Sequence, residues 1–169
     1  MNMKNSTNTP ILSTQSVAKT AVVAALYVAI TLVLAPISFG AVQLRFAEMF
    51  NYLALYNKRY VWGVTLGVFL ANFASPTWAF DVPIGSLSTL LVLILVRFVT
   101  AKIKDMRVKY VITAIIVAIS MFTIAGELYW VSHIPFWMSW LTIGIGELLS
   151  MVAGGFIIYP ISKRIDLED

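Results

Sequence analysis

Residues 83–100 read PIGSLSTLLVLILVRFVT, an apolar stretch rich in Leu and Val with one charged side chain, Arg97. An uninterrupted hydrophobic run of about 18 residues is typical of a helix that crosses a membrane. The whole chain has this character, because 60% of its 169 residues are hydrophobic and 12% are charged. An ordinary soluble domain has about 25% charged residues. We therefore expect an all-α membrane protein and exclude a water-soluble globule.

Six segments of the chain fit membrane spans. They cover approximately residues 16–35, 43–57, 60–74, 82–101, 108–127 and 136–160. Residues 1–14 are expected to form a polar cytoplasmic tail. Six spans of about 20 residues use roughly 120 positions, which leaves only tails and loops. The expected fold is a single integral membrane domain over residues 1–169, built as a bundle of six transmembrane helices.

The basic residues predict the orientation of this bundle. Lys and Arg are enriched in the cytoplasmic loops of membrane proteins. Eleven of the twelve lie before or in the first span, between spans two and three, between spans four and five, or after span six. The other loops, 36–42, 75–82 and 128–135, contain none. Both termini are therefore expected in the cytoplasm, and the polar segment 43–57 must cross the membrane.

Several kinds of chemistry are excluded or disfavoured. The absence of cysteine excludes disulfides, iron–sulfur clusters and thiol catalysis, and a single histidine argues against a zinc site. The sequence contains no phosphate-binding loop, no G-x-S-x-G elbow and no H-E-x-x-H motif. Basic residues spread through several loops do not form a nucleic-acid patch. We expect no enzyme activity, no cofactor, no metal and no nucleic-acid partner.

Five ionisable residues fall within or beside the spans, where charge is costly and is by default a sign of function. Arg45, Glu48, Asp81 and Glu127 lie at the extracellular end, and Glu147 lies about 16 Å deeper, near the midplane. Together they predict a pocket that opens outward. Structural alternatives exist: Arg45 and Glu48 as a surface ion pair, Asp81 as a helix N-cap, and Glu127 among the headgroups.

The neighbours of these charges indicate the class of ligand. Helical spacing places Tyr52 on the face of Arg45 and Glu48, and Trp140 on the face of Glu147. More aromatic residues crowd the outer loops: Trp78, Phe80, Tyr129, Trp130, Phe136 and Trp137. Four carboxylates and one arginine favour a cationic or donor-rich ligand, and aromatic walls favour a flat ring. We expect a small planar, nitrogen-rich solute, although the outer aromatics also fit an interfacial belt.

Two rows of small residues follow helical spacing. One is Ala21, Ala25 and Ala29 in the first span, and the other is Gly63, Gly67 and Ala71 in the third. Small residues four apart let membrane helices approach closely. Each row fits either packing within this bundle or docking to another membrane subunit.

Four segments carry a family resemblance: VQLRFAE at 42–48, WGVTLG at 62–67 with Ala71-Asn72, DVPIGSLSTL at 81–90, and GIGE at 144–147. In this order the chain resembles the substrate-binding S components of energy-coupling-factor (ECF) transporters, in particular the QueT-type queuosine-precursor group. The resemblance covers nearly the whole chain. It implies a subunit of the bacterial plasma membrane that binds its solute from outside and associates with a coupling transmembrane subunit and two ATPase subunits.

The resemblance also assigns residues and a solute. Ligand contacts carry over to Arg45, Glu48, Asn72, Asp81 and Glu147, and docking to the coupling subunit carries over to Ala21, Ala25 and Ala29. With these we group Glu127, Trp130 and Trp140 as substrate-binding candidates. The implied solute is a 7-deazaguanine such as preQ0 or preQ1, or queuine or queuosine.

The chain departs from the family pattern at 114–120, where AIIVAIS lacks an asparagine of the fifth span. Other interpretations stay open at this stage: an S component for another vitamin-like solute, a stand-alone secondary carrier or channel, or a membrane scaffold without a ligand.

Overall fold

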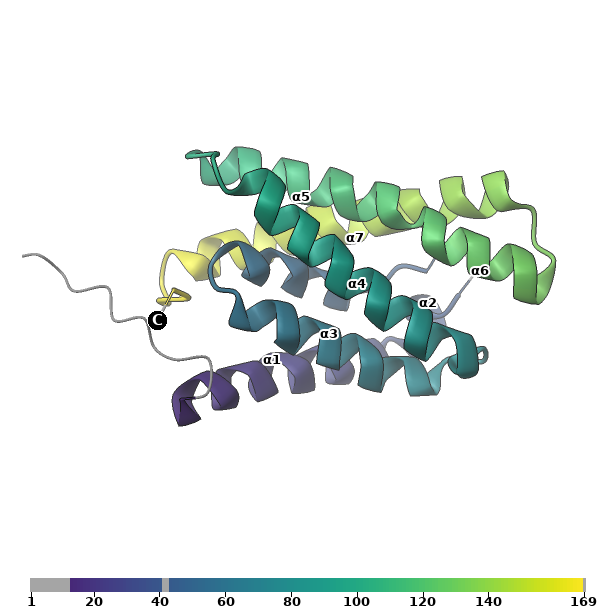
Figure 1. Cartoon of the computed structure of the whole chain (residues 1–169), viewed down its shortest axis with the longest axis horizontal. Helices are drawn as coiled ribbons and strands as arrows, with labels where there is room; N and C mark the ends of the chain where they lie inside the picture. Colours follow the sequence, from purple (N-terminus) through teal and green to yellow (C-terminus); the bar gives the residue numbers. More distant parts are fainter. Residues whose placement is uncertain (1–12, 41–42, 169) are drawn as a thin grey trace, which may run out of the picture.

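The computed structural model describes residues 13–40 and 43–168, and within them every regular element is a helix (Figure 1). The elements are α1 (Thr14–Val33), α2 (Ala35–Ser38), the 3₁₀ helix η1 (Phe46–Leu55), α3 (Arg59–Ala71), η2 (Asn72–Ala74), α4 (Trp78–Thr100), α5 (Met106–Ser120), α6 (Phe122–Ser132) and α7 (Phe136–Ser162). The expected polar tail lies outside the described residues apart from its last two positions.

Four segments are long and apolar enough to cross a membrane: Thr14–Val33, Trp78–Thr100, Met106–Ser132 and Phe136–Ser162. They coincide with four of the predicted spans, so the all-α membrane architecture is confirmed. The two remaining spans take shorter forms, since α3 has 13 residues and η1 has 10. Hydropathy and length therefore identify four crossings within the described chain, and the number six is not established by them.

Two boundaries differ from the sequence prediction. Helix α4 begins at Trp78 with Thr77 as its N-cap, so Asp81 lies in the first turn and is not the cap residue. The span predicted at 108–127 is interrupted at Met121 and continues as α6 to Ser132. Glu127 consequently lies inside a helix and is buried, rather than among headgroups at a helix end.

The segment η1 runs through the centre of the bundle and contacts α1, α3, α4, α5 and α7. Its backbone N–H groups bond to carbonyls three residues back, as between Glu48 N and Arg45 O at 3.0 Å. A 3₁₀ helix rises about 2.0 Å per residue, so ten residues extend about 20 Å, against about 15 Å in an α-helix. A short, polar segment thus reaches farther than an α-helix of equal length.

Helices α1 and α3 lie side by side along one edge of the bundle (Figure 1). Glycines of α3 make this contact close. A Cβ on Gly67 would lie 2.7 Å from Cβ of Tyr27, and one on Gly63 would lie 3.0 Å from the Thr20 carbonyl oxygen. The glycine row therefore serves packing within the chain.

The alanine row of α1 behaves differently. Ala21, Ala25 and Ala29 are all exposed, whereas Tyr27 on the same helix is fully buried. Of the two small-residue rows, only this one is open to a partner.

We predict that Gly67→Leu destabilises the protein by about 1–3 kcal/mol, because the added side chain must displace Tyr27 in a close-packed core. Thermal unfolding in detergent measures the effect. Gly126→Leu is the matched control, since a Cβ at Gly126 meets nothing within 4 Å. Equal midpoints for the two variants would contradict the α1–α3 contact described above.

Candidate functional site

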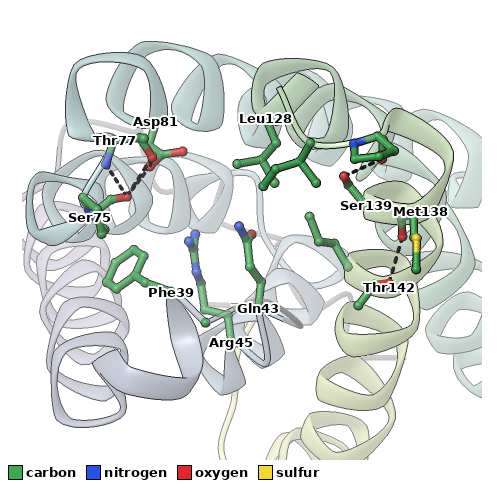
Figure 2. A pocket seen from close by; sticks show the side chains of 15 residues that line it. Phe39, Gln43, Arg45, Ser75, Thr77, Asp81, Leu128, Met138, Ser139 and Thr142 are labelled. Carbon is green, nitrogen blue, oxygen red and sulfur yellow. Dashed lines mark hydrogen bonds between the residues drawn. The ribbon is translucent and has the colours of Figure 1, made fainter. Parts of the chain in front are cut away.

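A cavity of about 450 Å³ opens at the end of the bundle where α4 and α7 begin and α6 ends. We call it the outer cavity. Figure 2 shows Gln43 and Arg45 on one side of it, Asp81 with Ser75 and Thr77 on another, and Ser139 and Thr142 of α7 opposite. Its size lies within the range of about 300–1,000 Å³ that is usual for small-molecule sites.

A smaller polar space of about 40 Å³, the inner cleft, lies next to the outer cavity. Gln43, Arg45 and Asp81 line both. The other residues of the inner cleft are Glu48, Val68, Asn72, Gly85, Ser88, Thr89, Met121, Ile124 and Glu147. Five of the eight substrate-binding candidates from the sequence, Arg45, Glu48, Asn72, Asp81 and Glu147, are therefore brought together around one space.

The 3₁₀ geometry of η1 decides which side chains reach this site. With three residues per turn, positions i, i+3 and i+6 align. Arg45, Glu48 and Asn51 form such a row, and Asn51 Nδ2 donates to Glu48 Oε2 at 2.5 Å. Tyr52, expected on this face from α-helical spacing, lies a third of a turn away and donates its hydroxyl to Met151 O at 3.0 Å. The prediction for Tyr52 was wrong because η1 is not an α-helix.

Glu48 is held from a second helix as well. The Tyr27 hydroxyl of α1 donates to Glu48 Oε1, and both residues are buried. A buried carboxylate is tolerated when its oxygens receive hydrogen bonds. Tyr27 and Asn51 supply them, and neither residue was among the sequence candidates. The row Arg45–Glu48–Asn51 was the one signal in the sequence that could have identified Asn51.

Arg45 lies between the two spaces. Its Nη1 is 3.9 Å from Glu48 Oε1, and its guanidinium carbon is 5.2 Å from the centroid of the Phe39 ring. The side chain of Arg45 is 15% exposed and that of Glu48 is 9% exposed, so the pair is not a surface ion pair. Arg45 therefore borders both the outer cavity and the inner cleft and lies beside one of the carboxylates.

Asp81 is fixed by the loop that precedes α4. Its Oδ2 accepts hydrogen bonds from Thr77 Oγ1 at 2.7 Å and from Ser75 Oγ. Its backbone carbonyl accepts from Asn72 Nδ2 at 2.8 Å. The Asn72 amide passes so close to Gly85 that a Cβ there would lie 2.6 Å from Nδ2. Asp81 is thereby fixed through Oδ2 and its backbone carbonyl at the edge of both spaces.

Glu147 and Glu127 carry side-chain oxygens to which no described residue donates a hydrogen bond. Glu147 is 3% exposed, and its Oε1 has no hydrogen-bond partner within the described residues. The charges nearest to it are those of Glu48 and Arg45. Both Oε atoms of Glu127 likewise lack a partner in this part of the chain, and the charge nearest to Glu127 is Asp81. Buried acceptors of this kind need a donor, which a ligand can supply.

The two aromatic candidates do not line the site. Trp130 is 80% exposed and borders neither the outer cavity nor the inner cleft. Trp140 donates from Nε1 to Ile119 O at 3.0 Å and so ties α7 to α5. Gly144, one turn farther along α7, brings that helix close to Ala118 O. An interfacial aromatic belt is the better explanation for the exposed Trp130. Helix packing is the better explanation for Trp140.

The charges of the inner cleft indicate the kind of ligand that it suits. The inner cleft presents one guanidinium against the carboxylates of Glu48, Asp81 and Glu147, together with the Asn72 amide. Among the described residues no group of three or more His, Asp or Glu side chains is placed to hold a metal ion. An excess of acceptors suits a ligand that carries several N–H donors or a positive charge.

The family model described as QueT transporter matches residues 17–163 of this chain. The chain belongs to the QueT transporter family. It is 40% identical over 164 residues to the queuosine precursor transporter QueT of Lactococcus lactis subsp. cremoris, covering 92% of this chain and 96% of the relative. No solved structure gives a significant match.

Membership in the QueT family agrees with the membrane-spanning helices. The chain is a multi-pass protein of the bacterial plasma membrane with a transport role, and it is not an enzyme. The resemblance to the QueT group that was inferred from the four sequence segments is confirmed.

We predict that Tyr27→Phe lowers the free energy of unfolding by about 1–3 kcal/mol, because Glu48 keeps its buried charge but loses a donor. Chemical or thermal denaturation in detergent measures this loss. Tyr129→Phe is the control, since Tyr129 is 51% exposed. Similar stabilities of the two variants would show that the Tyr27 hydroxyl does not support Glu48.

Proposed function

We propose that this chain is the substrate-binding S component of an ECF-type importer and that it captures a queuosine precursor. The observation that carries the proposal is the buried carboxylate of Glu147, which borders the inner cleft and has one oxygen without a partner in the described part of the chain. Membership in the QueT family and the 40% identity to a protein named queuosine precursor transporter support the choice of solute.

A 7-deazaguanine such as preQ0 or preQ1 carries N–H donors, which can pair with the acceptors in excess at this site. Its guanine-like edge offers adjacent N–H donors, which a single carboxylate can accept as a pair. The 450 Å³ outer cavity has room for the ring, whereas the 40 Å³ inner cleft has room only for a small polar group. In preQ1 the additional ammonium group would be favoured by the excess of carboxylates. Queuine and queuosine share the same edge.

The proposed topology has six crossings with both termini in the cytoplasm. The open end of the outer cavity lies opposite the end that carries Lys58, Arg97, Lys109 and Lys163. Basic loops favour the cytoplasm, so the cavity would open to the outside. The extension of η1 by about 20 Å, with residues 43–45 ahead of it, supports η1 as one of the crossings.

The partners would be a coupling transmembrane subunit and two ATPase subunits. The chain has no phosphate-binding loop, so energy would have to come from other proteins. The exposed row of Ala21, Ala25 and Ala29 on α1 is the surface we assign to the coupling subunit. Small side chains would let a partner helix approach the α1 backbone.

We predict that Glu147→Gln weakens binding of preQ1 at least about tenfold, because a charge-assisted hydrogen bond contributes about 1.5–3 kcal/mol. Tryptophan fluorescence or calorimetric titration of the purified protein measures the dissociation constant. Glu168→Gln, a change of the same type at an exposed position near the C-terminus, should leave it unchanged.

Two outcomes would count against the proposal. Absence of saturable binding of any deazapurine to the unmodified protein would exclude this class of solute. Net uptake by proteoliposomes that contain this chain alone, without ATP, would instead identify a stand-alone carrier.

We further predict that Ala25→Trp abolishes co-purification of the coupling subunit, because a large side chain would hold the two helices apart. Binding of preQ1 should not change, since Ala25 lies on the outer face of α1. Ala79→Trp, at another exposed alanine, is the matched control. Retention of the complex by Ala25→Trp would remove α1 from the docking surface.

A further inference from the structure

A second large space lies away from the solute site, in a groove between α5 and α7. Its volume is about 460 Å³, and its walls are mainly apolar, with Ala114, Leu148 and Val152 among them. Three tyrosines lie together along it. The rings of Tyr52 and Tyr110 stack at 4.1 Å, and Tyr159 meets Tyr110 edge-on at 5.5 Å.

One end of this groove is basic. Arg107 lines it there, and the ammonium group of Lys163 lies 4.5 Å from the centroid of the Tyr159 ring. Asp105 is the acidic group next to Arg107, where its carboxylate caps the start of α5. The positive charges of Arg107 and Lys163 therefore exceed the negative charge of Asp105 at this end of the groove, which we call its mouth.

The dimensions of the groove match one leaflet of a bilayer. From Leu148 to Tyr159 it follows α7 for eleven residues, or about 16 Å at 1.5 Å per residue. Half of a hydrocarbon core about 30 Å thick is about 15 Å. The basic mouth thus lies at the depth of the phosphates when the apolar part lies at the depth of one acyl layer.

The volume of the groove suits a thin occupant. One turn of an α-helix with its side chains, about 10 Å wide and 5.4 Å long, fills roughly 420 Å³. A helix seated wholly within 16 Å of groove would need about three times the space that is present. An extended hydrocarbon chain is much thinner and fits lengthwise.

We propose that this groove binds an anionic glycerophospholipid, with an acyl chain along Tyr52 and Val152 and its phosphate against Arg107 and Lys163. Basic residues near a membrane surface attract anionic lipid by about 1 kcal/mol each, or about fivefold in affinity. The site does not depend on the identity of the transported solute.

Native mass spectrometry of the purified chain tests this proposal, with phosphatidylglycerol and phosphatidylcholine of the same acyl chains as probes. We expect one phosphatidylglycerol to bind more tightly than phosphatidylcholine. Arg107→Gln together with Lys163→Gln should remove this preference, a loss of roughly 25-fold for two charges. Arg164→Gln, at an exposed neighbouring position, should retain it.

Filling the groove tests the acyl chain separately. Gly155→Leu should abolish binding of both lipids, and a Cβ at this position fits, since its nearest atoms are Tyr52 Oη at 3.5 Å and a Tyr110 ring carbon at 3.6 Å. Gly126→Leu is the control. Equal affinity for the two lipids, or unchanged binding by Gly155→Leu, would overturn the proposal. Circular dichroism verifies folding, and the double charge variant keeps the test valid if Gly155→Leu does not fold.

Discussion

The burial of the Glu48 carboxylate is the constraint on which the rest of the structure depends. Inside an apolar bundle a carboxylate is stable only when hydrogen bonds and a counter-charge replace water. Tyr27 supplies one hydrogen bond from α1, Asn51 supplies another from η1 itself, and Arg45 lies 3.9 Å away. Three of these four groups follow one another at intervals of three residues. The 3₁₀ geometry places these three residues in one row along the helix. In an α-helix, Asn51 would point about 60° away from the direction of Glu48. The buried charge and the unusual helix therefore stabilise each other.

Tyr27 extends this constraint to the packing of the bundle. Its hydroxyl reaches Glu48, while its ring lies against the α3 backbone at Gly67, where no side chain interferes. The distance between α1 and α3 thus sets the position of the hydroxyl, and through it the position of η1. The inner face of α1 makes this contact, and the alanines on its outer face are exposed among the described residues.

The sequence predicted those features that depend on local composition. Long apolar runs identified α1, α4 and α7, because hydropathy and length suffice for them, and the family segments identified five residues of the inner cleft. The conformation of η1 was not predictable, since it follows from partners distant in sequence. Tyr27 was missed because one tyrosine in an apolar span resembles any other membrane-facing aromatic. Trp130 and Trp140 were assigned to the site for the converse reason: aromatic residues near a membrane surface are common, and only contacts separate a cavity wall from an interfacial belt.

The inner cleft and the groove between α5 and α7 are bounded by the same two elements, η1 and α7. Helix α7 carries Glu147 toward the inner cleft, and the next residue, Leu148, lines the groove. In η1, Glu48 borders the cleft, whereas Tyr52 borders the groove and donates to Met151 O of α7. The hydrogen bond from Tyr52 to Met151 O therefore joins the two elements that carry both the acidic residues of the cleft and part of the wall of the groove.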